Sequence, residues 1–224
     1  MIIFIIVGLP FNNGEKLIYD VSYGPLYAGL MEMSVKDTVY NGIDCFKFSS
    51  VLSSNKDLSW LFKVHDTIFS IVGKKSFKPY KVEKHIHETN YRQISSYFFD
   101  YKNELIVYSD TVRYPLPDNV HDIVSINYYF RTVKLKDSFN ITVHADEETE
   151  FLRVLTRKNV KIKVGKKTYK TVEFKPNVKG KGKFGKAGSL IVYLTQDSLR
   201  IPVLIKTRMF IGFLEARLKF IKHE

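Results

Sequence analysis

The sequence contains a single cysteine, Cys45, among its 224 residues, so an intramolecular disulfide is excluded. Cys45 lies in residues 43–48, where apolar and polar side chains alternate. A nucleophilic cysteine needs a neighbouring base and a third group that orients this base, and the sequence around Cys45 supplies neither. We therefore expect Cys45 to be a buried structural thiol.

Long hydrophobic runs are also absent, because no segment reaches the roughly 20 apolar residues that span a membrane as a helix. Residues 1–9 are apolar and resemble the core of a secretory signal, but no basic residue precedes them and no small-residue cleavage site follows. Two interpretations stay open. Residues 1–13 are a signal-peptide remnant, which we favour, or they contain a first strand. In the favoured case, residues 14–224 form a single β-rich domain.

Acidic residues are scarce in the last third of the chain. Residues 157–224 contain 18 Lys and Arg against 4 Asp and Glu, whereas residues 1–156 contain 17 against 19. A positive field of this kind attracts nucleic acid, anionic lipid headgroups or acidic polymers. The charge therefore predicts a class of partner and leaves the partner itself open.

Strand patterns account for most of the chain. Residues 214, 216, 218 and 220 are apolar and alternate with the charged residues 215, 217 and 219, as expected of a strand with one buried face. Gly165 and Lys166 fit a two-residue hairpin turn between residues 160–164 and 167–175. Further strands are predicted at residues 17–23, 30–35, 43–52, 67–72, 80–87, 91–100, 105–109, 140–144, 151–156, 190–195 and 203–207.

One segment has helical spacing instead. Apolar residues recur at helical intervals after the turn at residues 115–117, which predicts a helix at about 119–132 with Asp118 as its N-cap. Asp122 and Arg131 lie about 13 Å apart along such a helix, so each is expected to contact the sheet rather than the other. The predicted fold is mainly β: a single strongly curved antiparallel sheet or open β-barrel with this one inserted helix.

Several segments in order resemble a bacterial family known as domain of unknown function 3108. The resemblance is carried by residues 14–21, Ala28-Gly29, Asp122 with Ser125, residues 128–131, residues 185–195 and residues 197–203. It implies an exported, periplasmic or envelope-associated protein with a curved sheet or open barrel. It implies no established activity and no catalytic residue. Family members usually begin with a full signal sequence, of which this chain has only a fragment.

Residues 180–186 have the glycine and lysine spacing of a phosphate-binding loop, but Ala187 replaces the hydroxyl residue that would reach Mg²⁺. The following residues also read as a strand, where such a loop would begin a helix. We therefore interpret the segment as a basic β-loop, and Lys181, Lys183 and Lys186 are its candidates for contacting anions.

Glu83, His85 and His87 would project from one face of a strand, because residues two apart share a face. Two imidazoles and a carboxylate are a possible set of zinc or copper ligands. No fourth ligand lies nearby in the sequence, so we predict solvent-facing histidines and neither a metal nor a cofactor.

Aromatic residues are dense at 97–101 and 128–130. In a β-protein such residues form the core in most cases, although a half-barrel can also leave a concave apolar side that holds a ligand. The candidates for lining such a cavity are Tyr97, Phe99, Tyr128 and Arg131.

These features favour a non-catalytic periplasmic or envelope binding protein. It would hold a hydrophobic or amphipathic molecule, such as a lipid, in its cavity, and its basic C-terminal face would contact an anionic envelope polymer or membrane surface. The alternative is a structural or assembly factor that binds an envelope protein or glycan. An enzyme ranks third, because no nucleophile–base set or close carboxylate pair is visible. A specific nucleic-acid binder ranks last, since no recognised motif supports it.

Overall fold

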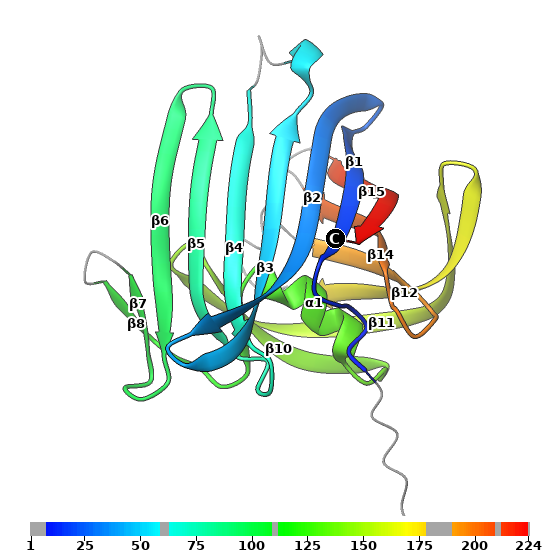
Figure 1. The fold of residues 1–224 in the computed structure, drawn as a ribbon. Coiled ribbons are helices and arrows are strands. Elements are labelled where there is room, and N and C mark those ends of the chain that lie inside the picture. The colour runs from blue at the N-terminus through cyan, green and yellow to red at the C-terminus, as the bar shows by residue number, and fades with distance from the viewer. Residues whose placement is uncertain (1–7, 59–62, 109–111, 178–189, 209–211, 224) are drawn as a thin grey trace, which may run out of the picture.

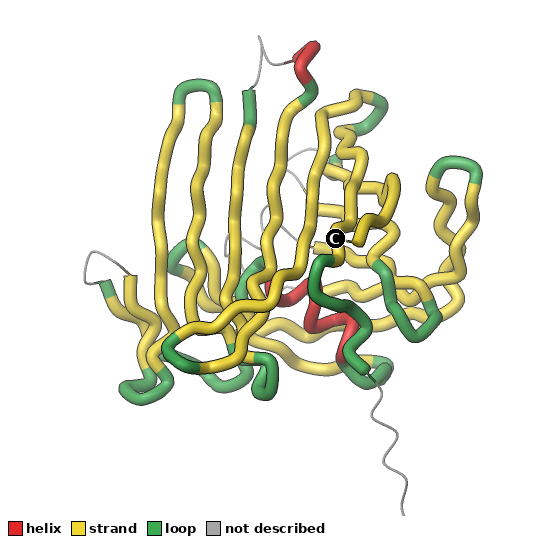
Figure 2. The backbone as a smooth tube through the Cα atoms, viewed as in Figure 1, coloured by secondary structure: helices red, strands yellow, loops and turns green. Residues whose placement is uncertain are grey.

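The computed structural model describes residues 8–58, 63–108, 112–177, 190–208 and 212–223. In these ranges the chain forms a 15-stranded sheet, one α-helix and one 3-10 turn (Figures 1 and 2). The strands are β1 (Glu15–Tyr23), β2 (Leu26–Tyr40), β3 (Ile43–Ser54), β4 (His65–Gly73), β5 (Pro79–Glu88), β6 (Tyr91–Asp100), β7 (Leu105–Tyr108), β8 (Arg113–Pro115), β9 (Val120–His121), β10 (Ser138–Ala145), β11 (Glu148–Val164), β12 (Lys167–Asn177), β13 (Leu190–Thr195), β14 (Pro202–Arg208) and β15 (Phe213–His223). The helix α1 is Ser125–Thr132, and the 3-10 turn η1 is Lys56–Leu58.

The mainly β prediction is confirmed, and all the predicted strands are present. Residues 91–100 and 190–195 match β6 and β13 at both ends. Two strands predicted at residues 151–156 and 160–164 are one continuous strand, β11, with a register shift between Arg157 and Val160 where it pairs with β12. The β11–β12 hairpin turns at Gly165 and Lys166 as expected, and Gly165 adopts a positive φ of 57°.

The first and last strands lie side by side in the middle of the sheet. The strand order is β8-β7-β6-β5-β4-β3-β2-β1-β15-β14-β13-β12-β11-β10-β9, so β1 pairs with β15 and two meanders run outward from this pair. The pairs are antiparallel, except that β9 is parallel to β10. Each meander consists of neighbours in sequence, as short connections favour.

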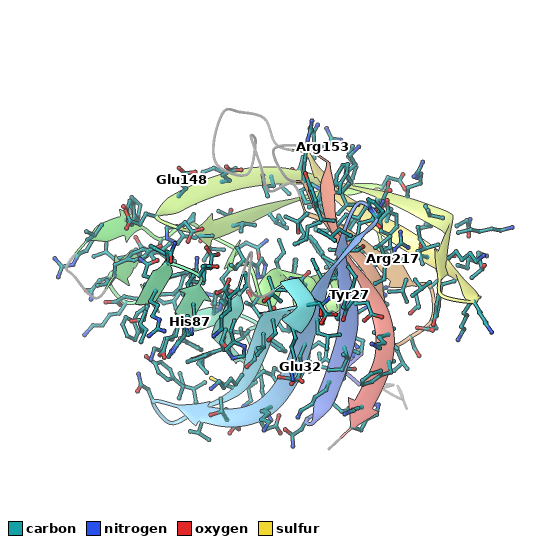
Figure 3. All side chains as sticks on the ribbon, turned by 90° about the horizontal axis from the view of Figure 1, so that it is seen from above. Tyr27, Glu32, His87, Glu148, Arg153 and Arg217 are labelled. Atoms are coloured by element: carbon teal, nitrogen blue, oxygen red, sulfur yellow. The ribbon has the colours of Figure 1, made fainter. Side chains whose placement is uncertain are left out.

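The two edge strands of the sheet, β8 and β9, lie close together because they follow each other in sequence. β8 ends at Pro115 and β9 begins at Val120, and five residues of chain reach at most about 17 Å. The sheet must therefore curl until its first and last strands nearly meet. Figure 3 shows this curl from above, with the sheet surrounding the central helix.

The helix is shorter than predicted. Val120 and His121, expected in the first turn, form β9 and pair with Thr142 and Val143, so their backbone is not available for a helix. Asp118 is not the cap: the first helical residue is Ser125 and the N-cap is Val124. Asp122 supplies the acceptor instead, because its Oδ1 accepts hydrogen bonds from the backbone N–H groups of Val124 at 2.8 Å and Ser125 at 3.0 Å.

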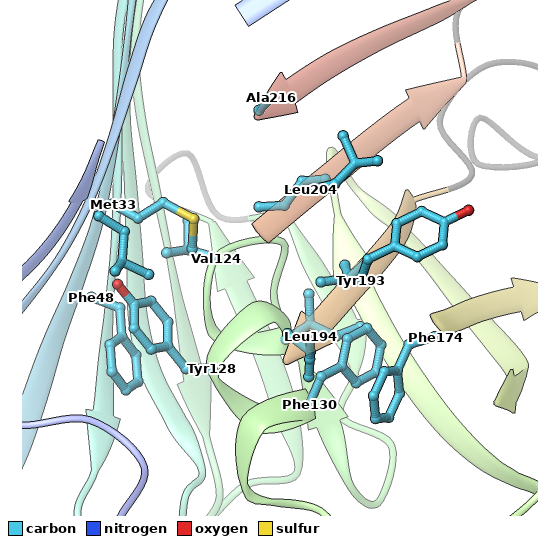
Figure 4. Packing of buried hydrophobic residues seen from close by; sticks show 14 of the residues in the cluster. Met33, Phe48, Val124, Tyr128, Phe130, Phe174, Tyr193, Leu194, Leu204 and Ala216 are labelled. Atoms are coloured by element: carbon cyan, nitrogen blue, oxygen red, sulfur yellow. The ribbon is translucent and has the colours of Figure 1, made fainter. Parts of the chain in front are cut away.

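α1 fills the interior of the curled sheet and joins its two walls. Tyr128 stacks on Phe48 of β3 with ring centroids 3.9 Å apart, and Phe130 stacks on Phe174 of β12 at 5.0 Å. Figure 4 shows these two helical side chains pointing to opposite sides of α1. All four rings are fully buried, so one short helix supplies core contacts to strands that are far apart in the sheet order.

The packed part of the chain starts before β1. Phe11 is 3% exposed and makes edge-on contacts with the rings of Phe46, Phe48 and Tyr128. Part of the segment predicted as a signal remnant, residues 1–13, therefore belongs to the core, whereas residues 1–7 lie outside the described ranges. Within those ranges no helix is both long and apolar enough to cross a membrane.

Candidate functional site

A pocket of about 210 Å³ is lined by strands from both walls of the sheet. We call it the mouth pocket. Its lining is mostly apolar and comes from six strands: Val21 of β1, Met31 of β2, Ser50 and Leu52 of β3, Asp66 and Ile68 of β4, Ile205 and Thr207 of β14, and Leu214 and Ala216 of β15.

The alternation of side chains along each strand places these residues on the inner face. Val21 and Met31 point the same way as Tyr19 and Met33, two positions along their strands, which are buried in the core. Tyr19 is fixed there by a hydrogen bond of 2.9 Å from its hydroxyl to the carbonyl of Pro202. The mouth pocket is therefore the part of the interior that the helix and its aromatic partners leave unfilled.

The pocket contains few hydrogen-bonding groups. Ser50, Asp66 and Thr207 supply them, and Oδ1 of Asp66 already accepts a hydrogen bond of 2.9 Å from the backbone N–H of His87. Such a mixture, mainly apolar with a few placed polar groups, is typical of small-molecule sites.

The four residues predicted to line a cavity do not line the mouth pocket. Tyr97, Phe99, Tyr128 and Arg131 are each at most 4% exposed, and their contacts hold the fold together. The density of aromatic residues therefore reflects the core in this region. The sequence cannot separate the two roles, because both need inward-facing apolar side chains.

Arg131 anchors the C-terminal end of α1 to β1. Its guanidinium forms a buried ion pair with Glu15, with N–O distances of 2.5 and 2.9 Å, and donates further hydrogen bonds to the carbonyls of Pro10 and Leu199. At the other end of α1, Ser70 of β4 donates a hydrogen bond of 2.6 Å to Oδ2 of Asp122. The prediction that Asp122 and Arg131 contact the sheet separately is confirmed.

Side chains bridge the gap between the two ends of the sheet. Tyr97 of β6 donates to the carbonyl of His144 on β10 at 3.2 Å, and the hydroxyl of Tyr108 on β7 lies 2.9 Å from Nε2 of the same histidine. Lys84 of β5 forms an ion pair with Asp146 beside them. We call these five residues the closing seam.

The closing seam is built around a neutral histidine. Burial, together with the positive charge of Lys84, lowers the pKa of His144 to about 4. Burial also raises the pKa of Tyr108 and Tyr97 well above the usual value for tyrosine. At neutral pH both tyrosine hydroxyls therefore stay protonated, so each can donate a hydrogen bond to His144 of β10.

The candidate metal ligands lie on the outer face of the sheet. Nε2 of His85 is 2.6 Å from Oε1 of Glu83, whose other oxygen accepts from Lys81 at 2.7 Å. These two contacts lower the pKa of Glu83. Across the described ranges, no group of three or more His, Cys, Asp or Glu residues is arranged to hold a metal ion.

The candidate anion-contacting residues Lys181, Lys183 and Lys186 lie outside the described residues. The structure does describe the neighbouring β11–β12 hairpin, where Lys161 and Lys170 face each other and are both exposed. On the opposite side of this hairpin, Val160, Ile162 and Tyr169 pack against the core. The hairpin is thus amphipathic, with a basic outer side.

The lining of the mouth pocket escaped prediction from sequence. Two of its residues, Leu214 and Ala216, were expected to face the core because of their period of two, and they do. Whether inward-facing residues leave a space depends on how far apart β4 and β14 lie, and no local pattern encodes this separation.

Comparison with known proteins agrees with this architecture. A crystal structure titled as a beta-barrel-like protein of domain of unknown function DUF1849, from Brucella abortus, is similar with a TM-score of 0.59 and 7% identity, covering 94% of this chain and 97% of that one. At this identity the likeness concerns the fold alone. No curated protein matches the chain.

The family model described as protein of unknown function (DUF3108) matches residues 18–219. Because this match spans nearly the whole chain, the protein belongs to the DUF3108 family.

Proposed function

We propose that the protein is a non-catalytic binding protein of the bacterial periplasm or envelope that holds a hydrophobic or amphipathic molecule in the mouth pocket. The observation that carries the proposal is the mainly apolar pocket on the concave side of the curled sheet. Its volume of about 210 Å³ lies below the roughly 300–1,000 Å³ of drug-sized sites. We therefore expect it to hold a small apolar body or the end of a single chain.

The basic outer side of the β11–β12 hairpin supports the second part of the proposal, a contact with an anionic surface. Lys161 and Lys170 are exposed, directly opposite each other on this hairpin. Lysines near an anionic membrane contribute about 1 kcal/mol each to binding. This contact would bring the protein to the envelope material from which a ligand is taken.

The alternative is a structural or assembly factor without a small-molecule ligand. The two hypotheses differ in whether the mouth pocket is occupied, and a pocket with an apolar lining favours the binding protein. Localisation in the periplasm or envelope is part of the proposal in both cases.

Native mass spectrometry of the full chain, purified gently after export to the periplasm, tests the proposal. We expect a reproducible added mass the size of a lipid or smaller amphiphile. The variant Thr207→Phe places a ring in the mouth pocket and should remove this mass. Thr168→Phe makes the same substitution at an exposed position of the β11–β12 hairpin and should retain it.

Either of two results would argue against ligand binding. Exported wild-type protein with no added mass would favour the assembly factor. An added mass that survives Thr207→Phe, with the fold intact by circular dichroism, would place the ligand somewhere other than the mouth pocket.

A further inference from the structure

A second concavity lies on the outer face of the sheet, separate from the mouth pocket. This outer groove crosses β1 to β6 and has a volume of about 960 Å³. Its lining residues alternate with core residues along the same strands: Ser34 lies between Met33 and Val35, and Ser49 follows Phe48. The groove is therefore built from outward-facing side chains and plays no part in filling the core.

One end of the outer groove is positively charged. Lys36 of β2 and Lys47 of β3 are directly opposite each other and both line the groove. Nζ of Lys47 lies 3.9 Å from the ring centroid of Phe69, which holds the ammonium over the groove. Two lysines on neighbouring strands thus concentrate positive charge at this end of the groove.

The other end carries a second basic group. Arg92 of β6 is directly opposite His87 of β5. On the other side of β5, Thr67 of β4 pairs with His85. The same register two residues further along places His65 beside His87. All three side chains line the groove. Along the described part of the chain, no carboxylate forms an ion pair with Arg92 or Lys47.

The separation of the two basic ends determines the size of a ligand that can use both. Lys47 and Ser53, which is opposite His65, are six residues apart on β3, a distance of about 20 Å in a strand. Between them the lining includes the hydroxyls of Ser34, Ser49 and Thr67, with Glu32 as the acidic member of the lining. A ligand that fits has negative charges about 20 Å apart and hydrogen-bonding groups between them.

We propose that the outer groove binds an anionic polysaccharide chain. Acidic groups of the chain contact Lys36 and Lys47 at one end and His65, His87 and Arg92 at the other, while sugar hydroxyls meet the serine and threonine side chains between them. This site lies in the part of the sequence with little net charge, so it is distinct from the basic hairpin, and it does not depend on the mouth pocket holding a ligand.

Fluorescence anisotropy with a labelled heparin-derived octasaccharide and the full-length protein tests the proposal. The double variant Lys36→Gln with Arg92→Gln removes one exposed charge from each end of the groove and should weaken binding about tenfold or more. The matched control, Lys102→Gln with Lys134→Gln, removes two exposed charges that lie outside both the groove and the β11–β12 hairpin and should change the affinity less than twofold. Thermal unfolding of both variants verifies that the fold is intact.

Two competitors examine the chemistry of the ligand. A heparin disaccharide cannot reach both ends and should compete at least about tenfold more weakly than the octasaccharide, because the gain from simultaneous contacts is lost. Inorganic polyphosphate of similar charge lacks sugar hydroxyls and should also compete more weakly. Equal loss of affinity in the control variant, or equal competition by polyphosphate, would overturn the proposal and leave only unspecific attraction of polyanions.

Discussion

Gly29 of β2 lies against the backbone at the end of β3. A Cβ atom at this position would be 2.0 Å from the carbonyl oxygen of Ser53 and 2.9 Å from Cα of Ser54, both of which belong to the backbone. Because backbone atoms cannot move aside without breaking the β2–β3 pairing, we expect Gly29→Ala to lower the free energy of unfolding by about 3 kcal/mol or more. Urea denaturation measures this loss.

Gly165→Ala is the matched control for this prediction. Gly165 also has a positive φ, but an added Cβ would meet no atom within 4 Å. Only the backbone conformation is then unfavourable, with a cost of about 1 kcal/mol. Equal losses of unfolding free energy in the two variants would show that the close approach at Gly29 does not affect stability.

Arg131 illustrates how a charged residue can be essential to a core. Its removal in Arg131→Met leaves the carboxylate of Glu15 buried without its partner, so we expect a loss of about 3–5 kcal/mol in the free energy of unfolding. Glu15→Leu combined with Arg131→Met should be less destabilised than Arg131→Met alone, because no unpaired charge remains. A double variant that loses the sum of the two single losses would contradict this account.

At the scale of elements, the closing seam makes the fold sensitive to acid. His144 in the seam and His121 on β9 both have a pKa lowered by burial to about 4, from about 6.5 in an unfolded chain. The unfolded state therefore binds protons first as the pH falls, so their contribution to stability is complete above about pH 6.5 and decreases toward pH 4.

Denaturation at pH 7 and pH 5 tests this dependence. The double variant His121→Asn with His144→Asn should lose less stability than the wild type between these two values. His223→Asn, at an exposed position near the end of β15, should behave like the wild type. An unchanged pH dependence in the double variant would mean that other groups cause the acid sensitivity.

The β11–β12 hairpin is the element expected to contact anionic surfaces. We expect Lys161→Gln with Lys170→Gln to weaken binding to phosphatidylglycerol vesicles by roughly thirtyfold in low salt, since each lysine contributes about 1 kcal/mol near such a surface. Vesicle sedimentation measures the change. Lys36→Gln with Arg92→Gln, in the outer groove, should have little effect, and the reverse order of effects would assign the surface contact to the groove.

At the scale of the whole molecule, the sheet depends on joining the two ends of the chain. β15 pairs with β1 on one side and β14 on the other, so it connects the two meanders. A chain truncated after Gly212 would leave two unpaired strand edges in the middle of the sheet and expose Tyr19 and Leu204 of the core. We expect it to lose cooperative thermal unfolding, as measured by circular dichroism.

A shorter truncation provides the comparison. Removal of residues 222–224 takes away the exposed side chains of Lys222 and His223 and leaves most of the β1–β15 pairing in place. This protein should still unfold cooperatively, at a somewhat lower temperature. Cooperative unfolding of the chain truncated after Gly212 would show that the two meanders fold without their central connection.

The sequence by itself determined every strand except β8 and β9, together with the β11–β12 hairpin and the presence of one inserted helix. These features follow from local chemistry: side chains alternate along a strand, Gly165 permits a tight turn, and apolar residues recur at helical spacing before Arg131. The length of the helix was overestimated because the pairing of β9 with β10 competes for Val120 and His121. Such a pairing joins residues far apart in sequence, so no local pattern reveals it.

Only the tertiary structure decided what the two faces of the sheet do. The period of two separates an inner from an outer face, but it does not reveal how tightly the sheet curls. The curl places Tyr97 and Tyr128 in a filled core and leaves the mouth pocket among Val21, Leu52 and Ala216. It also gathers Lys47 and Arg92 into one groove from strands that are not neighbours. Curvature is set by the twist accumulated over all 15 strands and by the contacts of α1 with both walls, and neither is contained in any single segment.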